Sequence, residues 1–88
     1  MAFRWNRWNE EHIESHGVDP SEAEQVVAGA MAPFPYVQAD EKYLVWGATE
    51  DGRLLQVIFV IDPDDSIFVI HARDLTENEK KTFRRRRK

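Results

Sequence analysis

The 88-residue sequence contains no cysteine, and it has only four glycines and four prolines. Without cysteine the chain has neither a disulfide framework nor a thiolate metal site, which is typical of a protein of the reducing cytoplasm. Its apolar stretches are too short for a membrane span, and its N-terminus lacks the basic and apolar leader of a signal peptide. We therefore expect one small cytoplasmic domain, residues 1–88, that is stabilised by burial of apolar side chains.

Charge is divided unevenly along the chain. The last thirteen residues hold seven bases and two acids, whereas residues 1–75 hold five bases and fourteen acids. A basic block of this kind either attracts a polyanion or is a solubilising end of the chain, and the sequence leaves both interpretations open. We expect residues 77–88 to form a basic helix that is mobile in the isolated protein, because Phe83 alone offers it an apolar contact.

Two helices are predicted near the N-terminus. The first covers residues 6–15, where apolar and aromatic side chains recur at helical spacing, and His16–Gly17 provides a typical end. The second begins after Asp19, with Pro20 at the first helical position and Glu22 three residues beyond the cap, a pattern typical of a helix start. Its buried stripe is predicted to consist of Ala23, Val26, Val27 and Ala30.

Three strands are predicted to follow, in residues 42–49, 53–62 and 67–74. They are rich in β-branched and aromatic residues and are separated by the turn signals EDG and PDDS, so we expect an antiparallel meander. A short edge strand at residues 36–38 is a fourth candidate. Strict alternation in the last strand places Ile67, Val69, His71 and Arg73 on one face and Phe68, Ile70 and Ala72 on the other.

A last helix is predicted to begin at Thr76, because Thr76 and Glu79 match a capping box. The order of the elements then predicts an α+β fold, in which two N-terminal helices pack on a three- to four-stranded antiparallel sheet and a basic C-terminal helix follows. The second face of the sheet is left for solvent, for the last helix or for a binding partner.

Motifs spread over nearly the whole chain resemble the BrnT family of bacterial toxins. They are FRWNRWNEEHIESHGVDPSEAEQVV, GRLLQVIFV and IFVIHARDLTENEKKTF, in that order. The resemblance implies a RelE-like fold and the toxin of a type II toxin–antitoxin system, a ribonuclease that inhibits translation. It also implies a partner antitoxin with a ribbon-helix-helix domain, and DNA contact only through the antitoxin complex. The sequence departs from the family at Asn6, Asn9 and Ser15, where charged residues are common.

The candidate catalytic residues are Arg53, Arg73 and His71. Metal-free cleavage of RNA needs a base, an acid and a cation that binds the phosphate. The resemblance assigns Arg53 and Arg73 to the phosphate, whose oxygens match a guanidinium, and His71 titrates near neutrality and can serve as base or acid. Each assignment has a structural alternative, namely a surface ion pair for Arg73 and a half-buried packing role for His71.

The candidate RNA-binding residues are Trp5, which can stack on a base, and four cations, Arg84, Arg85, Arg86 and Arg87. Trp5 and Trp8 nevertheless lie at helical spacing, which is typical of core residues. His12 and His16 have the spacing at which two imidazoles can share a zinc ion. No third ligand is evident in the sequence, so we expect neither a metal ion nor a cofactor.

Two functions therefore remain open. One is an endoribonuclease toxin, and the other is a non-catalytic toxin-like module that binds a ribbon-helix-helix partner. The excess of acids in residues 1–75 favours the second, because affinity for RNA depends largely on neutralising phosphates. Convergence of Arg53, Arg73 and residues 84–87 in one cleft would favour the ribonuclease, whereas their separation would favour the binding module.

Overall fold

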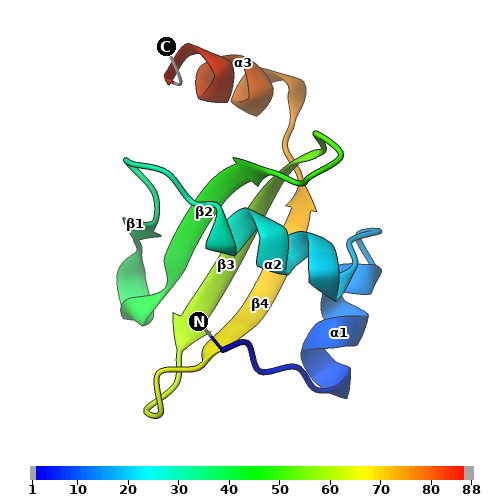
Figure 1. Cartoon of the computed structure of the whole chain (residues 1–88), viewed down its shortest axis with the longest axis vertical. Coiled ribbons are helices and arrows are strands. Elements are labelled where there is room, and N and C mark those ends of the chain that lie inside the picture. Colours follow the sequence, from blue (N-terminus) through cyan, green and yellow to red (C-terminus); the bar gives the residue numbers. More distant parts are fainter. Residues whose placement is uncertain (1, 87–88) are drawn as a thin grey trace.

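The computed structural model describes residues 2–86, and the side chains of residues 2–85. Two helices come first, a four-stranded sheet follows, and a third helix comes last (Figure 1). The predicted α+β fold is therefore confirmed. None of the described helices has the length and apolar content needed to cross a bilayer. The helices are α1 (Arg7–Glu14), α2 (Pro20–Ala28) and α3 (Glu77–Arg86), and the strands are β1 (Tyr36–Val37), β2 (Tyr43–Ala48), β3 (Leu54–Ile61) and β4 (Ile67–Asp74).

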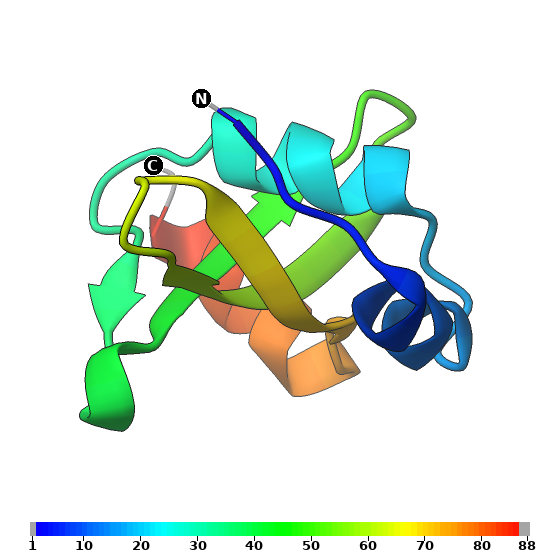
Figure 2. The same cartoon turned by 90° about the horizontal axis from the view of Figure 1, so that it is seen from below.

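The strands form one antiparallel sheet in the order β1-β2-β3-β4, which is the predicted meander with its short edge strand. α2 lies across one face of this sheet. α3 lies on the other side of the sheet, near one of its ends (Figure 2). α1 runs beside β4, at the edge of the sheet (Figure 1). Different helices therefore lie on the two sides of the sheet.

Both ends of α1 are fixed by local hydrogen bonds. Asn6 and Asn9 exchange backbone-to-side-chain hydrogen bonds of 2.8 and 3.2 Å, which satisfy amides of the first turn. At the other end the Val18 N–H donates to the Ile13 oxygen at 3.1 Å, and Gly17 takes a φ of 74°, which are the features of a Schellman turn. Ile13 and Val18 are both buried. The HGV segment therefore ends the helix, as predicted.

α2 packs on the sheet through the stripe predicted from the sequence. Ala23, Val26 and Val27 are buried, whereas Ala30 lies beyond the helix end and is only partly buried. Gly47 of β2 permits a close approach, because a Cβ at this position would lie 3.2 Å from the Val26 Cγ1 atom. The buried apolar side chains of the sheet are Val45, Leu55, Val57, Phe59, Ile67, Val69 and Ala72.

A bulge in β4 changes the predicted alternation of its side chains. Two consecutive residues of β3 pair with His71 and Val69, so Ile70 is left as an extra residue. Ala72 is fully buried on the same face as Val69, whereas His71 and Arg73 lie on the other face. The predicted grouping of Val69 with His71 and Arg73 was therefore wrong. One inserted residue moves the side chain of every later residue in the strand to the opposite face of the sheet.

The two N-terminal tryptophans differ in burial. Trp5 is partly buried, packs against the core, and donates its Nε1 hydrogen to the Glu24 Oε2 atom at 2.6 Å. Trp8 is 55% exposed, so the expectation that it is a core residue was wrong. Its ring lies over the edge of the sheet and stacks on Phe68, with 5.9 Å between the ring centroids.

Candidate functional site

Arg53 lies just before β3 and is held by three neighbours. Its Nε and Nη2 atoms donate to the Asp74 carboxylate at 2.8 and 3.0 Å, and its Nη1 atom donates to the Glu22 Oε1 atom at 2.9 Å. Nη1 also donates to the carbonyl oxygen of Gly17 at 2.8 Å. The hydrogen bond with Asp74 raises the pKa of Arg53 and lowers that of Asp74. Arg53 thus joins the end of β4, the start of α2 and the turn after α1.

Arg73 is paired with a different carboxylate. Its Nη1 and Nη2 atoms donate to the two carboxylate oxygens of Glu79 at 2.8 and 3.0 Å, and Nη1 also donates to the Asp74 carbonyl at 2.9 Å. The hydrogen bond with Arg73 lowers the pKa of Glu79 from 4.5 to about 2. Glu79 also accepts the Thr76 N–H at 2.8 Å, so the predicted capping box is confirmed. Arg73 therefore fixes the start of α3 to the end of β4.

The two arginines lie on opposite faces of the sheet. Arg73 and Asp74 are successive residues of β4 and so point to opposite sides. Arg53 pairs with Asp74 and with α2, whereas Arg73 pairs with α3. The sheet therefore separates the two arginines, and they do not converge in one anion pocket. A hollow beside α2 offers no such pocket either, since two glutamates and no arginine line it.

The basic C-terminal segment is described only in part. Arg84 and Arg85 are exposed on α3, whereas Arg87 and the side chain of Arg86 lie outside the described residues. Trp5, the other predicted RNA-binding residue, has its indole N–H engaged by a glutamate on α2. The RNA-binding role of these residues stays a prediction.

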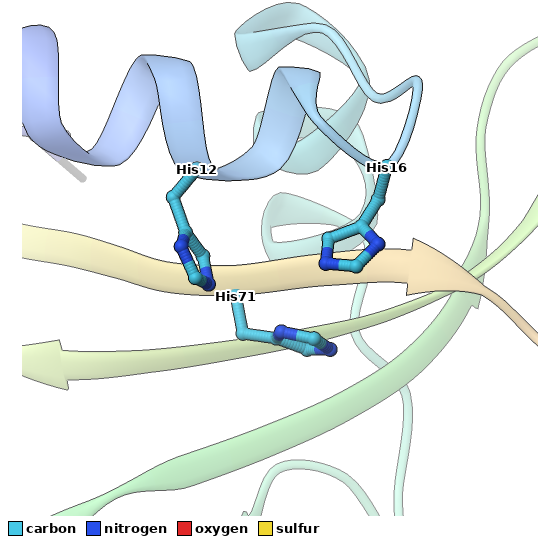
Figure 3. Close-up of side chains that lie close together, drawn as sticks. All are labelled: His12, His16 and His71. Atoms are coloured by element: carbon cyan, nitrogen blue, oxygen red, sulfur yellow. The ribbon is translucent and has the colours of Figure 1, made fainter.

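The three histidines of the chain lie together at the edge of the sheet (Figure 3). His12 belongs to α1, His16 to the turn that ends it, and His71 to β4. One ring nitrogen of each lies within 4.8 Å of the others, and the ring centroids are 5.3 to 6.1 Å apart. His12 and His16 are exposed and His71 is half-buried, so the cluster opens to solvent.

Local structure explains why the three rings meet. His12 lies in the last turn of α1 and His16 four residues later in the turn that follows, and this spacing brings their side chains to the same side. Asn9 fixes this helix to the sheet, because its fully buried amide donates to the Val69 carbonyl of β4 at 3.0 Å. The bulge in β4 places His71 on the face that α2 does not cover. Helix, turn and bulge are all needed to assemble the histidine cluster.

Aromatic rings border the cluster on the α1 side. Trp8 stacks on His12, with ring centroids 5.4 Å apart and an interplanar angle of 6°, and also stacks on Phe68. The Arg4 guanidinium lies 4.1 Å from the centroid of Phe68. Trp8 rather than Trp5 is therefore the exposed tryptophan with a ring beside the candidate site.

The surroundings of the half-buried His71 disfavour its charged form. Burial lowers the pKa of His71 below its ordinary value of 6.5, and the charges of His16, Arg73 and His12 lower it further. A neutral imidazole has one nitrogen with a lone pair, which can accept a proton or bind a metal ion. Within residues 2–85, no hydrogen bond or ion pair to a protein group engages the three imidazoles, so their nitrogens are available to a ligand.

The sequence named all three histidines but did not predict that they lie together. His12 and His16 stood out by their spacing, whereas His71 is remote in sequence and strict alternation assigned it to the wrong face. The position of His71 directly after the apolar run at residues 67–70 was the available signal. Spatial proximity of α1 and β4 was needed to join the three.

The three departures from the resembled family have structural roles here. Asn6 caps α1, and Asn9 binds α1 to β4. The Ser15 hydroxyl donates to the carbonyl oxygen of His12 at 2.6 Å, one turn earlier. Each of these side chains is used to shape or place α1, which carries two histidines of the cluster.

Comparisons with known proteins found no match to this chain. The chain matches no family model, no curated protein sequence and no solved structure. The resemblance to BrnT toxins therefore depends on the sequence motifs alone, and the fold and the histidine cluster are what the structure itself contributes.

Proposed function

We propose that this protein is a toxin-like member of a toxin–antitoxin pair that acts by binding a partner protein, without arginine-based cleavage of RNA. The nature of the partner, an antitoxin with a ribbon-helix-helix domain, comes from the sequence resemblance. The observation that carries the proposal is the position of Arg53 and Arg73 on opposite faces of the sheet, each bound to a carboxylate.

Both arginines would have to give up strong contacts to bind RNA. Each makes a two-point hydrogen bond with a carboxylate, which is among the stronger polar contacts in proteins. The body of the protein adds repulsion, because residues 1–75 hold fourteen acids and only five bases. Both effects disfavour a polyanion at these arginines and favour a protein partner.

The segment at residues 31–37 supplies an apolar surface for such a partner. Met31 is 71% exposed and Val37 is 73% exposed. Val37 belongs to β1, whose outer edge pairs with no strand of the described sheet. An accessible strand edge with apolar side chains is a template on which another chain can add a strand. We expect the antitoxin to contact this edge.

Co-expression with a ribbon-helix-helix protein encoded by the neighbouring reading frame tests this proposal. We expect the two chains to co-purify, and Val37→Lys to weaken the complex by about tenfold or more, because a charge would enter an apolar contact. Ala28→Lys is the matched control, since Ala28 is an exposed apolar residue of α2.

Expression of the chain alone is expected to leave growth unchanged. Growth arrest that a folded Arg73→Ala variant relieves would overturn the proposal.

A second candidate function is a ribonuclease toxin whose chemistry lies in the histidine cluster. Two imidazoles near one phosphate can divide the work, one accepting the 2′-hydroxyl proton and the other donating to the leaving oxygen. His71 is suited to the first role because burial lowers its pKa and so favours the form with a free lone pair, and His12 or His16 can take the second. The exposed ring of Trp8 is placed to stack on a base.

This second candidate has its own test. Purified protein is incubated with RNA in the presence of a chelator, beside folded variants with His12→Ala, His16→Ala and His71→Ala. Loss of cleavage by about 100-fold or more in the variants would support imidazole catalysis. Equal cleavage by all four proteins, or none by any, would rule it out.

A further inference from the structure

The histidine cluster has the composition of a metal site, which the sequence alone did not predict. We propose that His12, His16 and His71 together bind one divalent transition-metal ion, for which Zn²⁺ is the best match. Imidazole nitrogens are preferred ligands of zinc, and three of them leave a fourth position for water. The inference stands on the cluster alone and does not depend on the proposed function.

The separation of the three rings is compatible with coordination. Their ligand nitrogens lie within 4.8 Å of one another. A tetrahedral zinc ion with bonds of about 2.0 Å requires nitrogens about 3.3 Å apart, so each pair of rings must close by no more than about 1.5 Å. Rotation about the two side-chain torsions of an exposed histidine provides such a movement. His12 and His16 are exposed, so they can adjust around the half-buried His71.

Charge around the cluster also bears on metal binding. Arg73 is the nearby cation that would oppose a second positive charge. Its guanidinium is held by Glu79 at 2.8 Å, so this pair is close to neutral as a whole. The electrostatic cost of a bound divalent ion is therefore limited.

The surroundings of the cluster set the expected strength of binding. Histidines that bind metal tightly usually donate their second N–H to a carboxylate or carbonyl, and loss of such a partner lowers affinity about 10–100-fold. Among the described residues no such group accepts a hydrogen bond from these three imidazoles. We therefore expect a dissociation constant on the order of micromolar, weaker than that of a structural zinc site.

The composition of the chain makes the test clean. It contains no cysteine and no histidine outside this cluster, so imidazole-dependent binding reports on this site alone. Zn²⁺ is titrated into the full chain at pH 7.5 by calorimetry. We expect one ion per chain and a loss of affinity of about tenfold or more in His71→Ala, because a third ligand is removed. Glu14→Gln, which alters an exposed carboxylate near the end of α1, is the matched control and should bind normally.

Loss of the third ligand distinguishes the proposed site from an ordinary helix pair. Two histidines four residues apart bind Zn²⁺ weakly by themselves, so unchanged affinity in His71→Ala would overturn the proposal. Nuclear magnetic resonance of the unmodified protein gives a second readout that does not depend on the folding of a variant. The imidazole signals of all three histidines should shift together up to one equivalent of Zn²⁺. Shifts confined to His12 and His16, or no saturable shift, would contradict it.

Acidification provides a further check on the same sample. Because imidazoles must lose their protons to bind, affinity at pH 5.5 should be about tenfold or more below that at pH 7.5. Binding that is equal at both values would point to carboxylates and would overturn the assignment. Neither calorimetry nor resonance uses RNA or a partner protein, so failure of the metal site would leave the proposed function untouched.

Discussion

Asn9 is fully buried, yet each of its polar side-chain atoms has a partner. Its amide donates to the carbonyls of Val69 and Arg4 at 3.0 and 3.1 Å, and its carbonyl accepts the Asn6 N–H at 2.8 Å. In the sequence, Asn9 stands out only because the resembled family often has a lysine at this position. Its role could not be predicted, because Val69 lies 60 residues away and supplies a backbone oxygen, which no sequence pattern reveals.

Removal of this amide should therefore destabilise the protein. We expect Asn9→Ala to lower the free energy of unfolding by about 2–3 kcal/mol, because the buried Val69 carbonyl of β4 and the part-buried Arg4 carbonyl lose their donor. Urea unfolding followed by circular dichroism measures the change. Asn78→Ala, at an exposed position of α3, should change it by less than about 0.5 kcal/mol. Equal stability of the two variants would argue against this role of Asn9.

Arg53 is a second residue whose use is structural. We expect Arg53→Ala to lower the free energy of unfolding by about 2 kcal/mol, because it joins β4, α2 and the turn after α1 through charged hydrogen bonds. Arg7→Ala is the control, since the Arg7 side chain is 90% exposed and contacts Glu11 only at 3.7 Å. A variant of unchanged stability that has lost a biological activity would instead indicate a functional arginine.

Among the elements, local signals predicted helix ends and strands well. The caps at Asp19 and Thr76 and the HGV turn are set by neighbours in sequence, and all appear in the structure. The bulge at Ile70 was missed because its cause lies in the pairing of β4 with β3, and no glycine or proline marks it. That omission misplaced His71 and concealed the histidine cluster.

α3 is tied to the sheet by the Arg73–Glu79 pair, and this pair should respond to acid. The pKa of Glu79 is about 2 in the folded protein and 4.5 ordinarily, so its contribution is present above pH 4.5 and is lost as the pH falls towards 2. Because water reaches the pair, we expect about 1 kcal/mol. Unfolding of the wild type, Glu79→Gln and the exposed control Glu77→Gln is compared at pH 6 and pH 2.5. A stability difference between wild type and Glu79→Gln that persists at pH 2.5 would contradict this account.

The mobility of α3 can also be tested. Phe83 is buried with its ring centroid 6.3 Å from that of Phe34, and the Arg73–Glu79 pair holds the first turn, so this pair adds to the apolar contact that the sequence suggested. Such limited burial still predicts that amides of α3 exchange faster than those of β3. Phe83→Ala should raise the exchange rates in α3 and leave β3 unchanged. Amides of α3 that exchange as slowly as those of β3 would show a rigid helix.

In the molecule as a whole, the arginines considered for RNA binding lie on different parts of the surface and do not form one basic site among the described residues. The two candidate catalytic arginines are divided by the sheet, the exposed Arg84 and Arg85 lie on α3, and acids dominate the rest of the chain. The sequence named Arg53 and Arg73 as candidates but could not give the directions of their side chains, because direction depends on register and on the carboxylate that each arginine meets.

RNA cleavage by the purified chain in the presence of a chelator, compared with folded Arg53→Ala and Arg73→Ala variants, tests the central claim most directly. We predict no difference among the three proteins, because both arginines are committed to carboxylates on opposite faces of the sheet. Cleavage by the wild type that either folded variant loses by about 100-fold or more would contradict the claim and restore an arginine-based ribonuclease.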